Sequence, residues 1–69
     1  MDFKERFKKE YHELDDRINK LTNMLVKYQD GTLDFAPKCS YDLLNGQLKA
    51  MTVYRDYLEE RAIIEDIEL

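Results

Sequence analysis

Residues 3–28 read FKERFKKEYHELDDRINKLTNMLVKY, and this stretch decides the fold class. Its apolar residues follow one another at steps of three or four, which places them on one face of a helix. The steps approximate the heptad of a coiled coil, with charged and amide residues on the other face. A long amphipathic helix is therefore predicted over about residues 2–29. Its apolar positions are Phe3, Phe7, Tyr11, Leu14, Ile18, Leu21, Leu25 and Tyr28.

The residues that flank this helix predict where it begins and ends. Asp2 is a suitable N-cap, and Gly31 after Asp30 suits the left-handed position that follows a helix. Residues 30–39 are predicted to form a connection, because Pro37 disfavours helical geometry for the residue before it. We expect Phe35 to pack over the end of a helical hairpin. Ser40 can then cap a second helix over about residues 40–65.

The second helix contains LLNGQLKAMTVYRDYLEER, residues 43–61, and has more apolar residues than one stripe needs. One predicted stripe consists of Leu44, Leu48, Met51, Tyr54 and Leu58. Other apolar residues lie outside it, namely Leu43, Ala50, Val53 and Tyr57. Gly46 interrupts a run of good helix formers, which is understandable where another backbone or a ligand approaches closely. The prediction is an all-α, antiparallel two-helix hairpin with coiled-coil-like packing, formed by residues 1–69 as a single domain.

A hairpin of this size cannot cover all of its apolar residues. The chain has 69 residues, one cysteine and one histidine, so neither an intramolecular disulfide nor a Cys/His zinc site is expected to stabilise it. Further apolar residues would remain exposed in a monomer, namely Met24, Val26, Ile63, Ile64 and Ile67. Because large exposed apolar surfaces usually mark interfaces, the chain is predicted to form a homo-oligomer.

Charge and hydropathy exclude several classes of partner. The net charge of −4 argues against binding bulk nucleic acid, which requires a dense cationic surface. No apolar run approaches the length of a membrane span, and the first residues do not resemble a signal peptide, so a cytosolic chain is expected. Basic residues gather near the N-terminus and acidic residues near the C-terminus. In an antiparallel hairpin these ends would lie side by side and form weak ion pairs.

The sequence gives little support to an enzyme. His12 and Cys39 lie in different segments, and no nucleophile motif, phosphate-binding glycine loop or metal motif is present. No cofactor and no metal ion are therefore expected. Five tyrosines are more informative. Each is explained either by packing at a heptad position with its hydroxyl at the rim, or by stacking of its ring on a ligand base.

The two helices together resemble a known family. The segments EYHELDDRINKLTNML and LLNGQLKAMTVYRDYLEER are similar to small helical hairpins of crAss-like and other bacteriophages. That pattern is Glu-Tyr-x-Glu-Leu, Arg/Lys-Ile-x-Lys-Leu, Leu-Leu-x-x-Gln-Leu-x-x-Met-x-x-Tyr and a closing Leu-x-x-Arg. The matching residues are Glu10, Tyr11, Glu13, Leu14, Arg17, Ile18, Lys20, Leu21, Leu43, Leu44, Gln47, Leu48, Met51, Tyr54, Leu58 and Arg61.

Those hairpins in turn resemble the anti-CBASS and anti-Thoeris sponge proteins of phages. The resemblance implies an oligomer, commonly a hexamer, that sequesters a cyclic di- or trinucleotide immune signal in the cytoplasm of the infected bacterium without degrading it. It also implies that Tyr11 stacks on a base, that Lys27 contacts a phosphate and that Arg61 serves a site for cyclic trinucleotides. The connection GTLDFAPKCS departs from the acidic, leucine-containing linker of the family.

Two other functions remain open on the sequence alone. A small acidic phage protein is also suited to occupy a basic nucleic-acid channel of a host defence complex, as an anti-CRISPR does. A purely structural helical oligomer would need the same apolar surfaces and no ligand.

Overall fold

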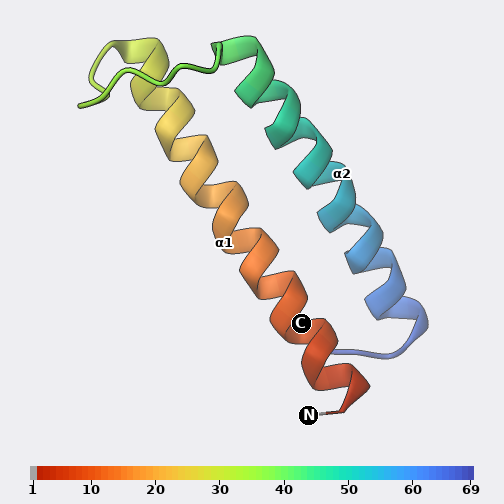
Figure 1. Ribbon diagram of the computed structural model, residues 1–69. Helices are drawn as coiled ribbons and strands as arrows, with labels where there is room; N and C mark the ends of the chain where they lie inside the picture. The colour runs from red at the N-terminus through yellow and green to blue at the C-terminus, as the bar shows by residue number, and fades with distance from the viewer. Residues whose placement is uncertain (1) are drawn as a thin grey trace.

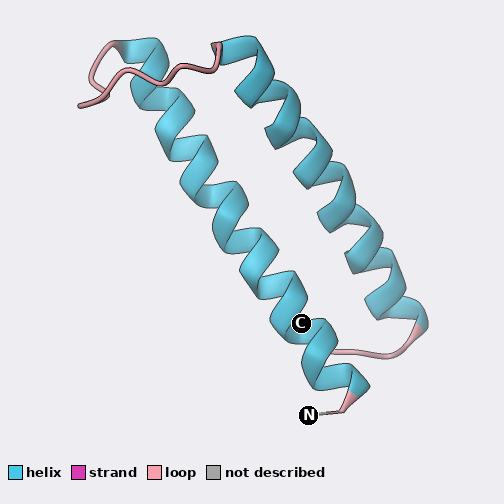
Figure 2. Cartoon of the chain, in the orientation of Figure 1, coloured by secondary structure: helices cyan, strands magenta, loops and turns pink. Residues whose placement is uncertain are grey.

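The chain forms a hairpin of two antiparallel helices (Figures 1 and 2). The computed structural model describes residues 2–69, and α1 (Phe3–Asp30) and α2 (Tyr41–Ile64) are its two helices. The molecule is elongated, with extents of 43 × 19 × 17 Å, and the start of α1 and the residues after α2 lie at the end opposite the connection (Figure 1). The predicted all-α helical hairpin is confirmed.

The predicted capping residues are confirmed at both helix starts and at the end of α1. The Asp2 side chain accepts a hydrogen bond of 2.7 Å from the Glu5 backbone N–H, and Ser40 Oγ accepts one of 3.1 Å from the Leu43 N–H. Gly31 follows α1 with φ 75°, in the left-handed region that glycine adopts without a steric cost. Local side-chain chemistry thus accounts for where the helices begin and where the connection starts.

The core is a single seam between the two helices. Its buried residues are Phe7, Leu14, Ile18, Leu58, Ala62 and Ile67, with Leu25 buried further along α1. The predicted stripe of α2 was wrong at one position, because Tyr54 is 44% exposed. Arg55 occupies the inner side instead, and its Nη1 lies 2.7 Å from Asp15 Oδ1. The ion pair with α1 lets this charged residue sit in the seam.

A tight turn after α2 buries a residue that was expected to be exposed. Asp66 has φ 57°, so the chain reverses, and the Ile67 N–H donates to the Ala62 carbonyl at 2.8 Å. This hydrogen bond is typical of a Schellman motif, in which the apolar residue after the left-handed position packs back on the helix. Ile67 is consequently only 7% exposed. Lys4 Nζ donates to the Asp66 carbonyl at 3.4 Å and links the turn to α1.

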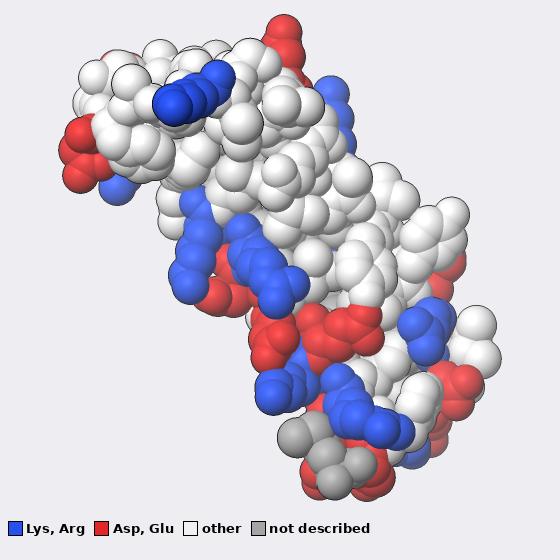
Figure 3. Space-filling view, viewed as in Figure 1, with Lys and Arg blue, Asp and Glu red and all other residues white. Residues whose placement is uncertain are grey.

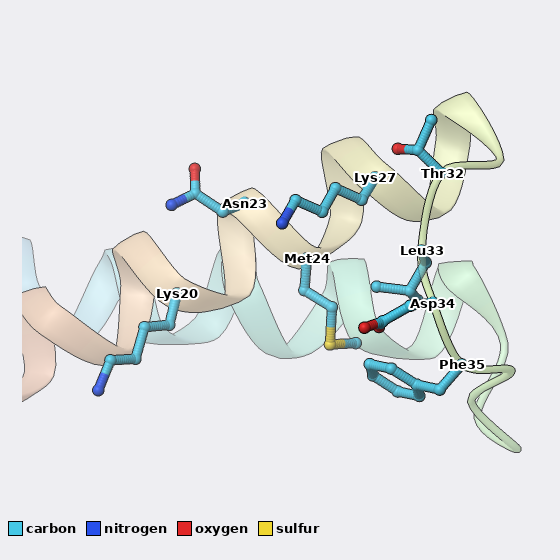
Figure 4. A pocket seen from close by; sticks show the side chains of 8 residues that line it. All are labelled: Lys20, Asn23, Met24, Lys27, Thr32, Leu33, Asp34 and Phe35. Carbon is cyan, nitrogen blue, oxygen red and sulfur yellow. The ribbon is translucent and has the colours of Figure 1, made fainter.

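Most of the surplus apolar residues of α2 are exposed, as predicted. Their exposed fractions are Leu43 65%, Val53 53%, Tyr57 63%, Ile63 81% and Ile64 80%. On α1, Val26 is also exposed, whereas Met24 is half-buried because it faces the connection (Figure 4). A Cβ atom added at Gly46 would meet no atom within 4 Å, so no part of the hairpin itself explains this glycine.

The ion pairs differ from those expected between the chain ends. Within residues 2–69, three of the four pairs link neighbouring turns of α1, and the fourth is Arg55 with Asp15. Side chains one turn apart on a helix meet more readily than side chains on separate helix ends. Charged groups of both signs alternate over the lower half of the view in Figure 3. The upper half of this view, towards the connection, shows fewer charged groups.

Candidate ligand-binding site

An open pocket lies where the connection crosses the last turns of α1 (Figure 4). Its volume is about 480 Å³. One wall comes from α1 and the other from the residues that follow Gly31. The lining residues are Lys20, Asn23, Met24, Lys27, Thr32, Leu33, Asp34 and Phe35.

Local backbone geometry forms this pocket. The left-handed conformation of Gly31 turns the chain back, and the Thr32 N–H donates to the Lys27 carbonyl at 2.9 Å. The following residues therefore run beside α1 instead of away from it. Phe35, expected to pack over the hairpin end, keeps 56% of its surface exposed although its ring points towards Met24 (Figure 4).

The pocket combines cationic, amide and aromatic groups with one carboxylate, that of Asp34. In Figure 4 the Lys27 ammonium and the Asn23 amide lie on one side, and the Phe35 ring and the Met24 thioether face each other on the other. Lys20 adds a second ammonium, which lies 2.9 Å from Asp16 Oδ2. Lysines recognise phosphate, and an exposed ring stacks on a base. The arrangement suits a small phosphorylated aromatic molecule.

Of the lining residues, only Lys27 was given a ligand-binding role in the sequence analysis, and the resemblance implied that role. Lys20, Asn23 and Lys27 lie at steps of three and four, so they share a face of α1, and this spacing was a usable signal. The contribution of Phe35 had no such signal, because it depends on the path of the connection.

Tyr11 lies near the other end of α1 and faces α2. It is half-buried against the core, and its hydroxyl donates to Glu59 Oε2 at 2.6 Å. This hydrogen bond is the main reason that the pKa of Tyr11 rises from 10.0 to about 12; burial and the charges of Glu59 and Asp15 contribute. His12 lies beside it, with ring centroids 5.4 Å apart in an edge arrangement. The hydroxyl is thus committed to a contact between the helices.

Tyr11 and Lys27 are not neighbours within one chain. Sixteen residues of helix separate them by about 24 Å along the axis and by about 160° around it. Tyr11 points towards α2, whereas the exposed Lys27 points away from the core and lines the pocket. A ligand that contacts both must therefore touch two copies of the chain.

Arg61 lies at the same end of the hairpin as Tyr11. Its guanidinium carbon is 5.0 Å from the centroid of the Phe7 ring, a distance typical of a cation–π contact. The side chain is otherwise exposed, in the last turn of α2. The three residues suggested by the resemblance are therefore divided, with Lys27 at the connection end and the other two at the opposite end.

Comparison with known proteins identifies the family of this chain. Over residues 2–69, neither helix is long and apolar enough to cross a membrane. No significant match was found among curated proteins or among solved structures. The model of one protein family, Sequestin, matches residues 1–64, which is nearly the whole sequence. The chain therefore belongs to the Sequestin family.

Proposed function

We propose that this protein binds a cyclic nucleotide immune signal of the bacterial host and sequesters it without degrading it. Membership of the Sequestin family carries the proposal, because the family name suggests a sequestering role and a binding protein rather than an enzyme. The pocket at the connection supports it with groups that suit a nucleotide. The resemblance to phage sponge proteins supports a role in phage anti-defence, inside the infected cell.

In this proposal Lys27 and Lys20 contact the phosphates and the Phe35 ring stacks on a base. Stacking of one base on an aromatic side chain contributes about 1–3 kcal/mol in single-stranded nucleic-acid sites. The exposed Phe35 ring can accept a base without rearrangement of the core, because it does not belong to the buried cluster.

Tyr11 and Arg61 are proposed to act from a second copy of the chain. The assembly is a homo-oligomer, with the hexamer of the sponge proteins as its expected size. The exposed apolar residues of α2 support assembly, since they have no cover in one hairpin. Tyr11 together with His12 offers a second aromatic surface, and Arg61 offers a cation for a cyclic trinucleotide.

Thermal unfolding with a panel of cyclic di- and trinucleotides tests the proposal. A ligand at one hundred times its dissociation constant stabilises the folded state by about 2.7 kcal/mol, which should raise the midpoint of thermal unfolding by about 10–20 °C. Calorimetry should show that Lys27→Glu lowers the affinity for the bound cyclic nucleotide at least tenfold. Phe35→Ala should lower it by a comparable factor. Chromatography of the released ligand should recover it unchanged.

Lys9→Glu is a matched control for Lys27→Glu. Lys9 is exposed on the same face of α1, eighteen residues away, and the change in charge is identical. Equal affinity of both variants would contradict the assigned role of Lys27. No binding of any cyclic nucleotide by the unaltered protein would contradict the function itself.

The exposed face of α2 favours one alternative function. Exposed apolar surface of this kind also suits an inhibitor that binds a host protein, such as an anti-CRISPR. In that case charged substitutions at Val53 and Tyr57 would abolish inhibition in infected cells, and substitutions at Lys27 would leave it unchanged.

A further inference from the structure

A second heptad runs along α2 on a face that α1 does not cover. Its positions follow steps of three and four along the whole helix. Most of its apolar members are more than half exposed in the hairpin. We call this face the outer seam, and it consists of Leu43, Gly46, Ala50, Val53, Tyr57, Glu60 and Ile64.

We infer that the outer seam pairs with the outer seam of a second copy, with the two α2 helices antiparallel and Gly46 opposite Tyr57 of the second copy. In this register Ala50 lies opposite Val53 and Leu43 lies opposite Glu60, and twofold symmetry repeats each pairing. The inference concerns how two copies meet, and it holds whether or not a nucleotide is the ligand.

Complementary size supports this register. In an antiparallel coiled coil the first apolar position of one heptad faces the second apolar position of the other helix. Gly46 has open space where a side chain would be, and Tyr57 is the largest residue of the seam. Placing them opposite each other fills the space above the glycine. It also explains a residue that costs about 1 kcal/mol relative to alanine inside a helix.

Complementary charge supports the same orientation. Lys49 and Asp56 flank the outer seam on one side and are both exposed. They are seven residues apart in one chain, about 10 Å, which is too far for an ion pair on one helix. The antiparallel register brings Lys49 of one copy within about 3 Å, along the helix axis, of Asp56 of the other, and symmetry makes this pair twice. The partner's ammonium would meet a shallow hollow lined by Val53, Asp56, Tyr57 and Glu60.

A parallel pairing lacks these matches. It would place Glu60 beside Glu60 and leave the space at Gly46 facing another glycine. Like charges directly opposite each other are destabilising, and an unfilled gap loses van der Waals contacts.

Charge reversal tests the orientation. Sedimentation should show that Lys49→Asp raises the dissociation constant of the assembly about tenfold, since two attractive pairs become repulsive. Asp56→Lys should do the same, and the double variant should restore the original value. Lys9→Asp, on the outer face of α1, is the control and should change nothing. Circular dichroism checks that each variant is helical.

Disulfide trapping tests the register. In a Cys39→Ser background, a mixture of Gly46→Cys and Tyr57→Cys chains should form a disulfide-linked pair on mild oxidation. Each variant alone should not, because its cysteines would lie beyond the Cα separation of about 7 Å that a disulfide allows. Efficient crosslinking of either variant alone would show a parallel seam and overturn the inference. The inference would also be overturned if the unaltered chain remained a helical monomer. It would be overturned as well if the double charge variant did not regain the dissociation constant of the unaltered assembly.

Discussion

Leu58→Ala should remove most of the stability of this fold. Leu58 is 0% exposed and is the most completely buried large side chain of the hairpin. Leucine-to-alanine changes in protein cores cost about 2–5 kcal/mol, and the upper part of that range applies where neighbours cannot fill the cavity. Two long helices packed along a single seam have little freedom to move together and fill such a cavity. A core of this size rarely supplies more than about 3–5 kcal/mol in total, so the variant should be largely unfolded at 25 °C.

Urea denaturation followed by far-ultraviolet circular dichroism measures this effect. Leu43→Ala is the matched control, because it makes the same chemical change at a residue that is 65% exposed. Its effect on the hairpin should stay within about 0.5 kcal/mol. If Leu43→Ala lowers the free energy of unfolding by more than this, the decrease should depend on protein concentration, because it would come from a lost interface between copies. The decrease caused by Leu58→Ala should not depend on protein concentration. If both variants lowered the free energy of unfolding equally and independently of protein concentration, the assignment of Leu58 to the core would be refuted.

Three further outcomes are expected. The pKa of Tyr11 is about 12 in the folded chain and 10.0 ordinarily, so the stabilisation of the hairpin by the Tyr11–Glu59 hydrogen bond should be complete below pH 10 and lost towards pH 12. Tyr11→Phe should abolish this pH dependence of the free energy of unfolding, measured by urea titration. Asp15→Ala should destabilise the hairpin by about 1–3 kcal/mol because it leaves Arg55 without its partner, whereas Asp15→Ala combined with Arg55→Met should recover the midpoint of thermal unfolding. Asp66→Gly should stabilise the chain by up to about 1 kcal/mol in the same assay, since it relieves a left-handed conformation.

The helices themselves could be predicted because the decisive signals are local. Asp2, Gly31 and Ser40 act within one helical turn, and the apolar spacing of α1 is regular. The rotation of α2 was less well determined. Tyr54 and Arg55 are adjacent and both fit a step of three or four, so hydrophobicity selected the tyrosine. In the fold, the carboxylate of Asp15 on α1 makes the arginine acceptable at that position.

Features that depend on tertiary structure could not be predicted. Ile67 is buried through a left-handed turn at Asp66, where the usual glycine is absent and the sequence shows no helix stop. The pocket itself was not predicted, since Phe35 reaches it by the course of the connection; the sequence analysis named one of its lining residues, Lys27, and did so through the resemblance. Periodicity predicts the faces of helices, but it contains no information about where a loop crosses them.

The turn at the end of α2 makes Ile67, beyond the last helix, part of the core. Trimming of Leu69 and Glu68 by a carboxypeptidase should proceed freely, because both are exposed, and should slow sharply at Ile67. Removal of that residue would uncover Phe7 and Ala62 and weaken the core at the end opposite the connection. A shortened form of this protein should therefore keep Ile67.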